Sequence, residues 1–204
     1  MKKYELTDEI FIINGVTLYR IKALKNINNR AQCTYITKGE LGGFIESETN
    51  LSQDGLSWVG NNAKIYGNAK VHGDAVVADG AEVYGNAEIA GTALVLNNAK
   101  IYGNAKVYGN AHIHGEAKIT DNAEVYGNAE ILGNALVRDN AKIYGNAQVY
   151  GNTHIHGEVK ITDNAEVYGN AKVGGTSKVW SNGCVRGNGK IWGNASVGPN
   201  SIVQ

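Results

Sequence analysis

From Val59 to Ile202 the chain repeats every six residues. Each unit opens with an aliphatic residue, carries a small residue, usually alanine, four positions later, and fills its other positions mainly with polar, glycine or aromatic residues. Ile65–Lys70, for example, reads Ile-Tyr-Gly-Asn-Ala-Lys. A fixed short period predicts a stacked solenoid, and a period of six predicts a parallel β-helix with one unit per side of each coil. Twenty-four units at three per coil predict about eight triangular coils.

Strand alternation assigns a direction to each side chain of a unit. Ala63 and Ile65 are predicted to point into the coil, and Lys64 and Tyr66 to point outward. Glycine at the third position is predicted to turn the corner, because it accepts positive φ at little cost. Asparagine fills the fourth position in eighteen of the twenty-four units, and we expect these amides to stack and hydrogen-bond along the rod. The six exceptions are Asp74, Gly80, Thr92, Glu116, Glu158 and Thr176.

A longer duplication overlies the hexads. Three 42-residue blocks of seven units align, at 59–100, 101–142 and 143–184, and a partial block covers 185–204. Since seven units are two coils plus one further side, each copy of a block is predicted to lie one face around the rod from the last. His112 and His114 are therefore expected on a different side from His154 and His156.

The duplication places the outward tyrosines in vertical ladders, because residues 18 apart lie on neighbouring coils. The three predicted ladders are Tyr66-Tyr84-Tyr102, Tyr108-Tyr126-Tyr144 and Tyr150-Tyr168, with Arg186 on the last rung of the third. Alternating charges, such as Lys106, Glu124 and Lys142, run beside them. Such a ladder stabilises the surface that it lies on by roughly 0.2–1 kcal/mol per cross-strand pair. It also forms an aromatic strip suited to binding a partner chain or ligand.

Composition is that of an ordinary soluble protein. The 19 acidic and 19 basic side chains cancel, so no net charge favours nucleic acid or an anionic membrane. The first ten residues carry charges where a signal peptide needs an apolar run, and no stretch is apolar enough to span a membrane. We therefore expect a cytoplasmic protein. Cys33 and Cys184 have no spacing typical of a metal site or a disulfide framework.

Residues 1–58 contain no hexads and are predicted to form an N-terminal cap with a β-hairpin, distinct from the β-helix of residues 59–204. Two apolar runs, Glu9–Ile13 and Val16–Ile21, flank Asn14-Gly15, the strongest short signal for a two-residue turn. A solenoid end exposes strand edges and an apolar bore, which a cap covers. The glycines of 39–43 lack the lysine and the flanking elements of a phosphate loop.

The last units change character. Glycine replaces the inward alanine at Gly183 and Gly189, and tryptophan appears at outward positions. Trp180, Arg186 and Trp192 form a candidate contact patch. A further interpretation is that this end packs on another copy of the chain.

The repeat resembles the hexapeptide-repeat superfamily of β-helices over residues 59–202. The phrases Leu18–Leu24 and Leu41–Ser47 are similar to a phage and bacterial subgroup that is assigned as acyltransferases by similarity alone. The resemblance implies a left-handed coil, an exception to the usual crossover rule, and a side-by-side homotrimer. It departs from the family pattern at the residue after the aliphatic one, which is often tyrosine here.

Catalysis in this superfamily typically uses a histidine base near a subunit interface, with acetyl-coenzyme A as the acyl donor. The candidate bases are His114 and His156, which are copies of one block position and are predicted on different faces. Duplicated surface residues on separate faces favour inheritance over one tuned site. His112 and His114 offer two metal ligands where zinc requires three or four, so no metal site is predicted.

Two function classes follow. The first is a non-catalytic rigid scaffold or binding module, associated with a phage and directed at a host component or ligand, without a cofactor. The second is an acyl-coenzyme A-dependent transferase with its site between subunits. Near-identical rotated blocks favour the first, because repeated presentation tolerates duplication better than one active site does.

Overall fold

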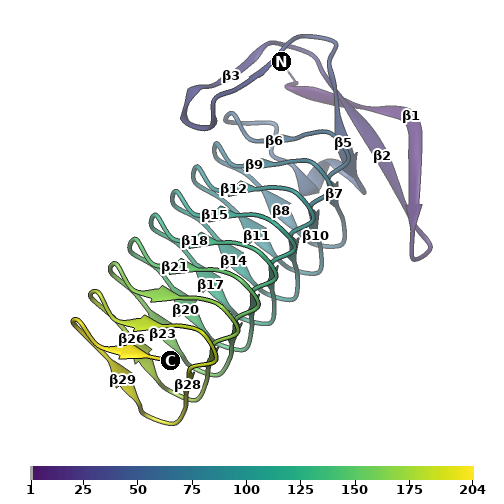
Figure 1. Cartoon of the computed structure of the whole chain (residues 1–204). Helices are drawn as coiled ribbons and strands as arrows, with labels where there is room; N and C mark the ends of the chain where they lie inside the picture. Colours follow the sequence, from purple (N-terminus) through teal and green to yellow (C-terminus); the bar gives the residue numbers. More distant parts are fainter. Residues whose placement is uncertain (1) are drawn as a thin grey trace.

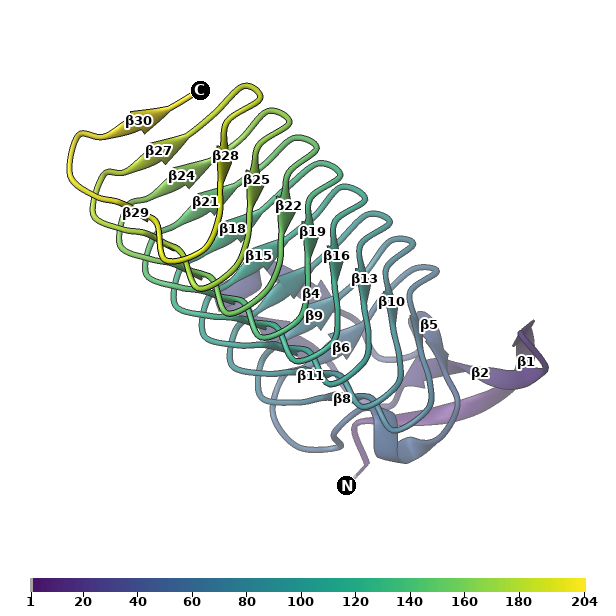
Figure 2. The same ribbon diagram turned by 90° about the horizontal axis from the view of Figure 1, so that it is seen from below.

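Each six-residue unit forms a strand of two residues followed by a corner. In β7 (Lys64–Ile65) the lysine is half-buried and the isoleucine fully buried, as strand alternation requires. Strands 18 residues apart pair in parallel, as in Glu82 with Lys64 and Lys100. The computed structural model describes residues 2–204, and the predicted parallel β-helix is confirmed (Figures 1 and 2).

The strands form three long sheets, one per side of the rod. The first face stacks β5 (Leu41–Ile45), β7, β10 (Glu82–Val83), β13 (Lys100–Ile101), β16 (Lys118–Ile119), β19 (Leu136–Val137), β22 (His154–Ile155), β25 (Lys172–Val173) and β28 (Lys190–Ile191). The second face stacks β8 (Lys70–Val71), β11 (Glu88–Ile89), β14 (Lys106–Val107), β17 (Glu124–Val125), β20 (Lys142–Ile143), β23 (Lys160–Ile161), β26 (Lys178–Val179) and β29 (Ser196–Val197). The third face stacks β6 (Trp58–Val59), β9 (Val76–Val77), β12 (Leu94–Val95), β15 (His112–Ile113), β18 (Glu130–Ile131), β21 (Gln148–Val149), β24 (Glu166–Val167), β27 (Cys184–Val185) and β30 (Ile202–Val203).

The bore of the rod is filled by the two inward positions of each unit. The predicted column of Ile65, Val83, Ile101 and Ile119 is fully buried, and so are the alanines that precede each of them. Full burial of such an aliphatic side chain contributes about 1.5–3 kcal/mol. One continuous apolar core therefore runs through the coils.

Asparagine ladders hold the three corners, as predicted. The Nδ2 group of Asn68 donates to Oδ1 of Asn86 at 3.0 Å, and Asn86 repeats the bond to Asn104 at 2.9 Å. A second ladder runs from Asn110 and a third from Asn134. Each amide thus donates along the rod, in the direction of the next coil.

Aspartate takes over from glycine at several corners. Asp121 and Asp139 occupy the third position with φ near 60°. The Oδ2 atom of Asp121 accepts the backbone N–H of Asp139 at 3.2 Å, and Oδ2 of Asp139 accepts that of Gly157 at 2.8 Å. This bond to the next coil offsets the cost of a left-handed conformation in a residue with a Cβ.

The hexad count of eight coils is one short at the N-terminal end. The 9-stranded third face carries one strand per coil and begins at β6. β5 already pairs in parallel with β7, and Leu51 bridges to Val71 on the second face. With β6 these two contacts complete an additional coil, in which Ile45, Leu51 and Val59 fill the bore as the hexad aliphatics do. The hexad count misses it because eight residues, instead of six, separate Leu51 from Val59.

Two hairpins cover the start of the rod. β1 (Tyr4–Ile13) and β2 (Val16–Ala23) form the predicted hairpin around Asn14-Gly15, both at positive φ, and β2 pairs with β5. β3 (Ile27–Asn29), the 3₁₀ turn η1 (Arg30–Gln32) and β4 (Thr34–Ile36) make the other, and η2 (Glu48–Asn50) follows β5. No helix within residues 2–204 is long and apolar enough to cross a membrane.

Lys3 anchors this cap. Its side chain is fully buried, and Nζ donates to the carbonyl oxygen and hydroxyl of Ser57 at 2.8 and 3.0 Å. Burial lowers the pKa of Lys3 to about 8. Lys3 is thereby tied to the loop that leads into β6.

Candidate functional site

The tyrosines form the predicted ladders of stacked rings. On the first face, Tyr66 and Tyr84 lie 5.0 Å apart between ring centroids with planes within 5°, and Tyr84 and Tyr102 lie 4.9 Å apart. The rings are half-buried, so their outer parts remain open to solvent. Aromatic rings at this offset distance attract one another beyond simple burial, by about 0.5–1.5 kcal/mol per pair.

The same motif recurs on the other two faces. Tyr108, Tyr126 and Tyr144 follow strands of the second face and stack at 4.9 Å, whereas Tyr150 and Tyr168 follow the third face and stack at 4.7 Å. The predicted one-face rotation of each block is confirmed. Two and one-third coils separate successive copies, which is about 11 Å along the axis at the usual strand spacing.

Charged side chains flank two ladders. Lys100 Nζ lies 3.3 Å from Glu82 Oε2 beside the first, and Lys142 Nζ lies 3.0 Å from Glu124 Oε1 beside the second. Glu124 Oε2 also accepts the hydroxyl proton of Tyr108 at 3.2 Å. The third ladder has Gln148, Glu166 and Cys184 in these positions instead.

The ladder environment shifts tyrosine ionisation. Burial raises the pKa of Tyr66 to about 12, with a smaller contribution from the Glu82 carboxylate. Burial also raises the pKa of Tyr108 to about 12, together with the negative charge of Glu124 and the hydrogen bond that Tyr108 donates to it. The folded protein therefore holds protons that the unfolded chain releases from about pH 10. Stability should fall as pH rises from about 10 to 12, because the unfolded state then binds fewer protons.

We expect Glu124→Gln to lower the pKa of Tyr108, because both the charge and the strongest acceptor of its hydroxyl are weakened. Absorbance titration of tyrosinate in the folded protein measures this shift. Glu130→Gln, which changes a carboxylate of the third face without a tyrosine partner, is the matched control. An unchanged titration in Glu124→Gln would show that burial alone sets the pKa.

An aromatic contact beside the first-face ladder joins the N-terminal hairpin to the rod, which the sequence pattern did not indicate. Phe11 of β1 packs against Phe44 of β5 at 5.6 Å, and Lys64 Nζ lies 4.9 Å from the Phe11 ring centroid. Ile10 and Ile12 beside it are 51% and 63% exposed. The hairpin projects from the start of the rod next to this face (Figures 1 and 2). Phe44 itself is buried and lies in register with Lys64, so this contact flanks the tyrosine ladder, whose preceding rung is Glu46.

The C-terminal candidates surround the rod. Trp180, Arg186 and Trp192 follow strands of the second, third and first faces in turn. Trp180 donates from Nε1 to the Ser196 hydroxyl at 3.0 Å. The structure thus distributes these three side chains over different faces and does not gather them into one flat patch.

The histidines are also dispersed. His114 follows the third face and His156 the first, as the block rotation requires. His156 has neighbours: its ring centroid lies 4.9 Å from that of Trp192, and its Nδ1 atom 4.0 Å from Asp139 Oδ2. No group of three or more His, Cys, Asp or Glu side chains in residues 2–204 is placed to hold a metal ion.

Comparison with known families points to the repeat itself. Residues 99–115 and 141–157 match a family model described as the YdcK beta solenoid repeat. The chain is a β-solenoid repeat protein. The two matched segments begin 42 residues apart, so they are the same part of consecutive blocks, and together they cover a minority of the solenoid. No curated protein matches the chain.

Proposed function

We propose that the solenoid is a non-catalytic binding scaffold whose tyrosine ladders contact a partner chain. The observation that carries the proposal is the repetition of one stacked tyrosine motif on all three faces. Tyrosine supplies apolar contact area and a hydroxyl from a side chain with little conformational freedom, which is why it is enriched in interfaces. A ladder of half-buried rings loses still less freedom on binding.

Repetition also gives the scaffold several equivalent sites. Successive motifs are rotated by one face and displaced along the axis by about 11 Å. A partner with repeated or flexible segments is able to engage two or three motifs at once, which raises its overall affinity without new kinds of contact. The first-face motif also has the exposed hairpin residue Phe11 beside it, packed on Phe44 of β5.

The proposal extends to assembly and setting. The resemblance to hexapeptide-repeat proteins supports a side-by-side homotrimer, and the phrases Leu18–Leu24 and Leu41–Ser47 support an association with phages and a host component as the partner. We also propose that the protein acts in the cytoplasm, a reducing compartment that suits its two free cysteines, Cys33 and Cys184.

Removal of one ladder tests the binding role. Tyr66, Tyr84 and Tyr102 are replaced together by serine, and the host proteins retained by the immobilised variant are compared with those retained by wild type. We expect the partner to be lost or strongly reduced. The joint variant His114→Ala and His156→Ala is the control and should retain it, since neither side chain belongs to a ladder. Equal retention by the ladder variant and wild type, with both folded by circular dichroism, would contradict the proposal.

A further inference from the structure

One rung is missing at the N-terminal end of the second-face ladder. Outward residues of successive coils here are His72, Ala90, Tyr108, Tyr126 and Tyr144, as the pairing of their strands fixes. Tyr108 therefore stacks on Tyr126 on one side, at 4.9 Å, and meets only the methyl group of Ala90 on the coil below. One face of the terminal ring is left without an aromatic partner.

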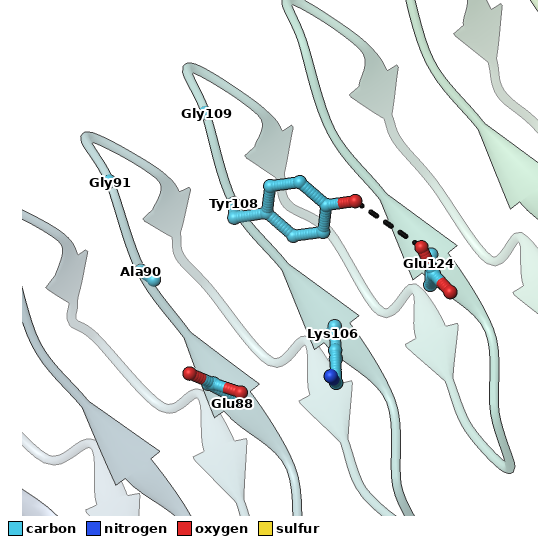
Figure 3. Close-up of a pocket in the computed structure, with 7 residues that line it drawn as sticks. All are labelled: Glu88, Ala90, Gly91, Lys106, Tyr108, Gly109 and Glu124. Carbon is cyan, nitrogen blue, oxygen red and sulfur yellow. Dashed lines mark hydrogen bonds between the residues drawn. The ribbon is translucent and has the colours of Figure 1, made fainter.

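A cavity occupies the place of the missing ring. Its volume is about 460 Å³, within the range of small-ligand sites. It is lined by Glu88, Ala90, Gly91, Lys106, Tyr108, Gly109 and Glu124 (Figure 3). Ala90 and Gly91 lie on one coil, and the Tyr108 ring lies on the next with its hydroxyl directed at Glu124 (Figure 3). The cavity is open to solvent on its outer side.

The charges around the cavity are unequally engaged. Glu88 Oε1 lies 2.8 Å from His72 Nε2, and Glu124 bonds to both Tyr108 and Lys142. Lys106 projects beside the ring, exposed, and among residues 2–204 it has neither an ion-pair nor a hydrogen-bond partner. Its ammonium group is therefore the charge that remains available to a ligand.

The chain itself covers two empty rungs near its C-terminal end, both at glycines. Gly174 leaves a rung empty between His156 and Trp192, and the Trp192 ring lies so close that a Cβ at Gly174 would approach it to 2.4 Å. Trp192 thereby reaches His156 with centroids 4.9 Å apart. The Trp180 ring covers Gly198 in the same way. An aromatic ring thus covers a rung that lacks a side chain. At Ala90 the rung carries a methyl group, over which a ring has to lie, and within residues 2–204 no side chain supplies that ring.

We propose that the cavity above Ala90 binds a flat aromatic ring that carries an anionic group. The ring takes the vacant rung and stacks on Tyr108 at the spacing of the ladder, and the anion pairs with Lys106. The site does not depend on the partner proposed above, because it is one cavity at one end of one ladder.

The test is calorimetric titration of the protein with four small molecules that differ in ring type and charge. Indoleacetate carries ring and anion, indoleacetamide lacks the charge, tryptamine reverses it, and cyclohexylacetate keeps the anion without a flat ring. We expect saturable binding of indoleacetate at one site, with the other three weaker by about tenfold or more, the order expected for losing a stacking or charge contact. No measurable indoleacetate binding, or tighter binding of tryptamine, would overturn the proposal.

Variants of the chain then locate the site. Ala90→Tyr completes the ladder and should abolish indoleacetate binding, whereas Thr162→Tyr extends the same ladder at its other end and should leave binding unchanged. Lys106→Gln should reduce indoleacetate to the affinity of indoleacetamide. Tyr108→Leu removes the ring on which the probe stacks and provides a second variant in case Ala90→Tyr fails to fold. Binding that survives both Ala90→Tyr and Tyr108→Leu would place the probe elsewhere and refute the assignment.

Discussion

Replacement of Ile119 by lysine should unfold the central coils. Ile119 is fully buried in the bore and pairs with Ile101 and Val137 on the coils at either side. A lysine there either carries an unpaired charge into an apolar column or loses its proton, and an uncompensated buried charge costs about 3–5 kcal/mol. Its neighbours in the bore are apolar and buried, so they offer the ammonium group no hydrogen-bond partner.

The effect should be local along the rod. Each coil contacts only its neighbours, so the energetics of a solenoid are close to one-dimensional. Hydrogen exchange should show protection lost around β13, β16 and β19 and retained near the cap. Ile119→Val, which keeps an apolar side chain, should cost only about 0.5–1.5 kcal/mol. A thermal melt of Ile119→Lys that matches wild type would refute the inward assignment of this column.

Gly157→Ala should destabilise the rod far more than Gly187→Ala. Both glycines have positive φ, at 87° and 60°, so both substitutions carry the cost of a left-handed residue, about 1–2 kcal/mol. Only Gly157 is crowded: a Cβ there would lie 2.5 Å from the carbonyl oxygen of Gly175, whereas at Gly187 nothing lies within 4 Å. Relief of that contact requires backbone movement, which adds roughly 1–3 kcal/mol.

Urea unfolding of the two variants measures the difference. The comparison separates two reasons for corner glycines, the left-handed conformation and the close approach of the next coil. Asp121 and Asp139 show that the first is tolerated when φ stays near 60° and the side chain binds the next coil. Equal destabilisation at Gly157 and Gly187 would mean that the stacked corners yield without cost.

The parts of the structure that follow from a period were predictable from the sequence. The six-residue period predicts which residues point into the bore and which form the corners. Because three units make one coil, residues 18 apart are predicted to stack in ladders. Ile45 and Leu51 were missed as parts of a coil, since the eight residues from Leu51 to Val59 break the six-residue register that joins them to the repeat. The contact of Phe11 with Phe44 depends on how the hairpin folds back on the rod, which no local pattern encodes.

The candidate sites divide in the same way. The tyrosine ladders were predicted residue by residue, and their stacking is confirmed. The cavity above Ala90 arises because one position in the second-face column of tyrosines has a small side chain. It is visible only when the residues 18 apart in that column are compared, and no local motif marks it. The contact of His156 with Trp192 spans two coils across Gly174, a spacing of 36 residues that the 18-residue period of neighbouring coils does not indicate.

Native mass spectrometry of the solenoid isolated from its own host, with and without acetyl-coenzyme A, tests the scaffold proposal most directly. We predict a mass that includes a bound partner, that loses it when Tyr66, Tyr84 and Tyr102 are replaced by serine, and that does not change with acetyl-coenzyme A. An assembly without a partner that binds about one acetyl-coenzyme A per subunit interface would contradict the account and identify the protein as an acyltransferase.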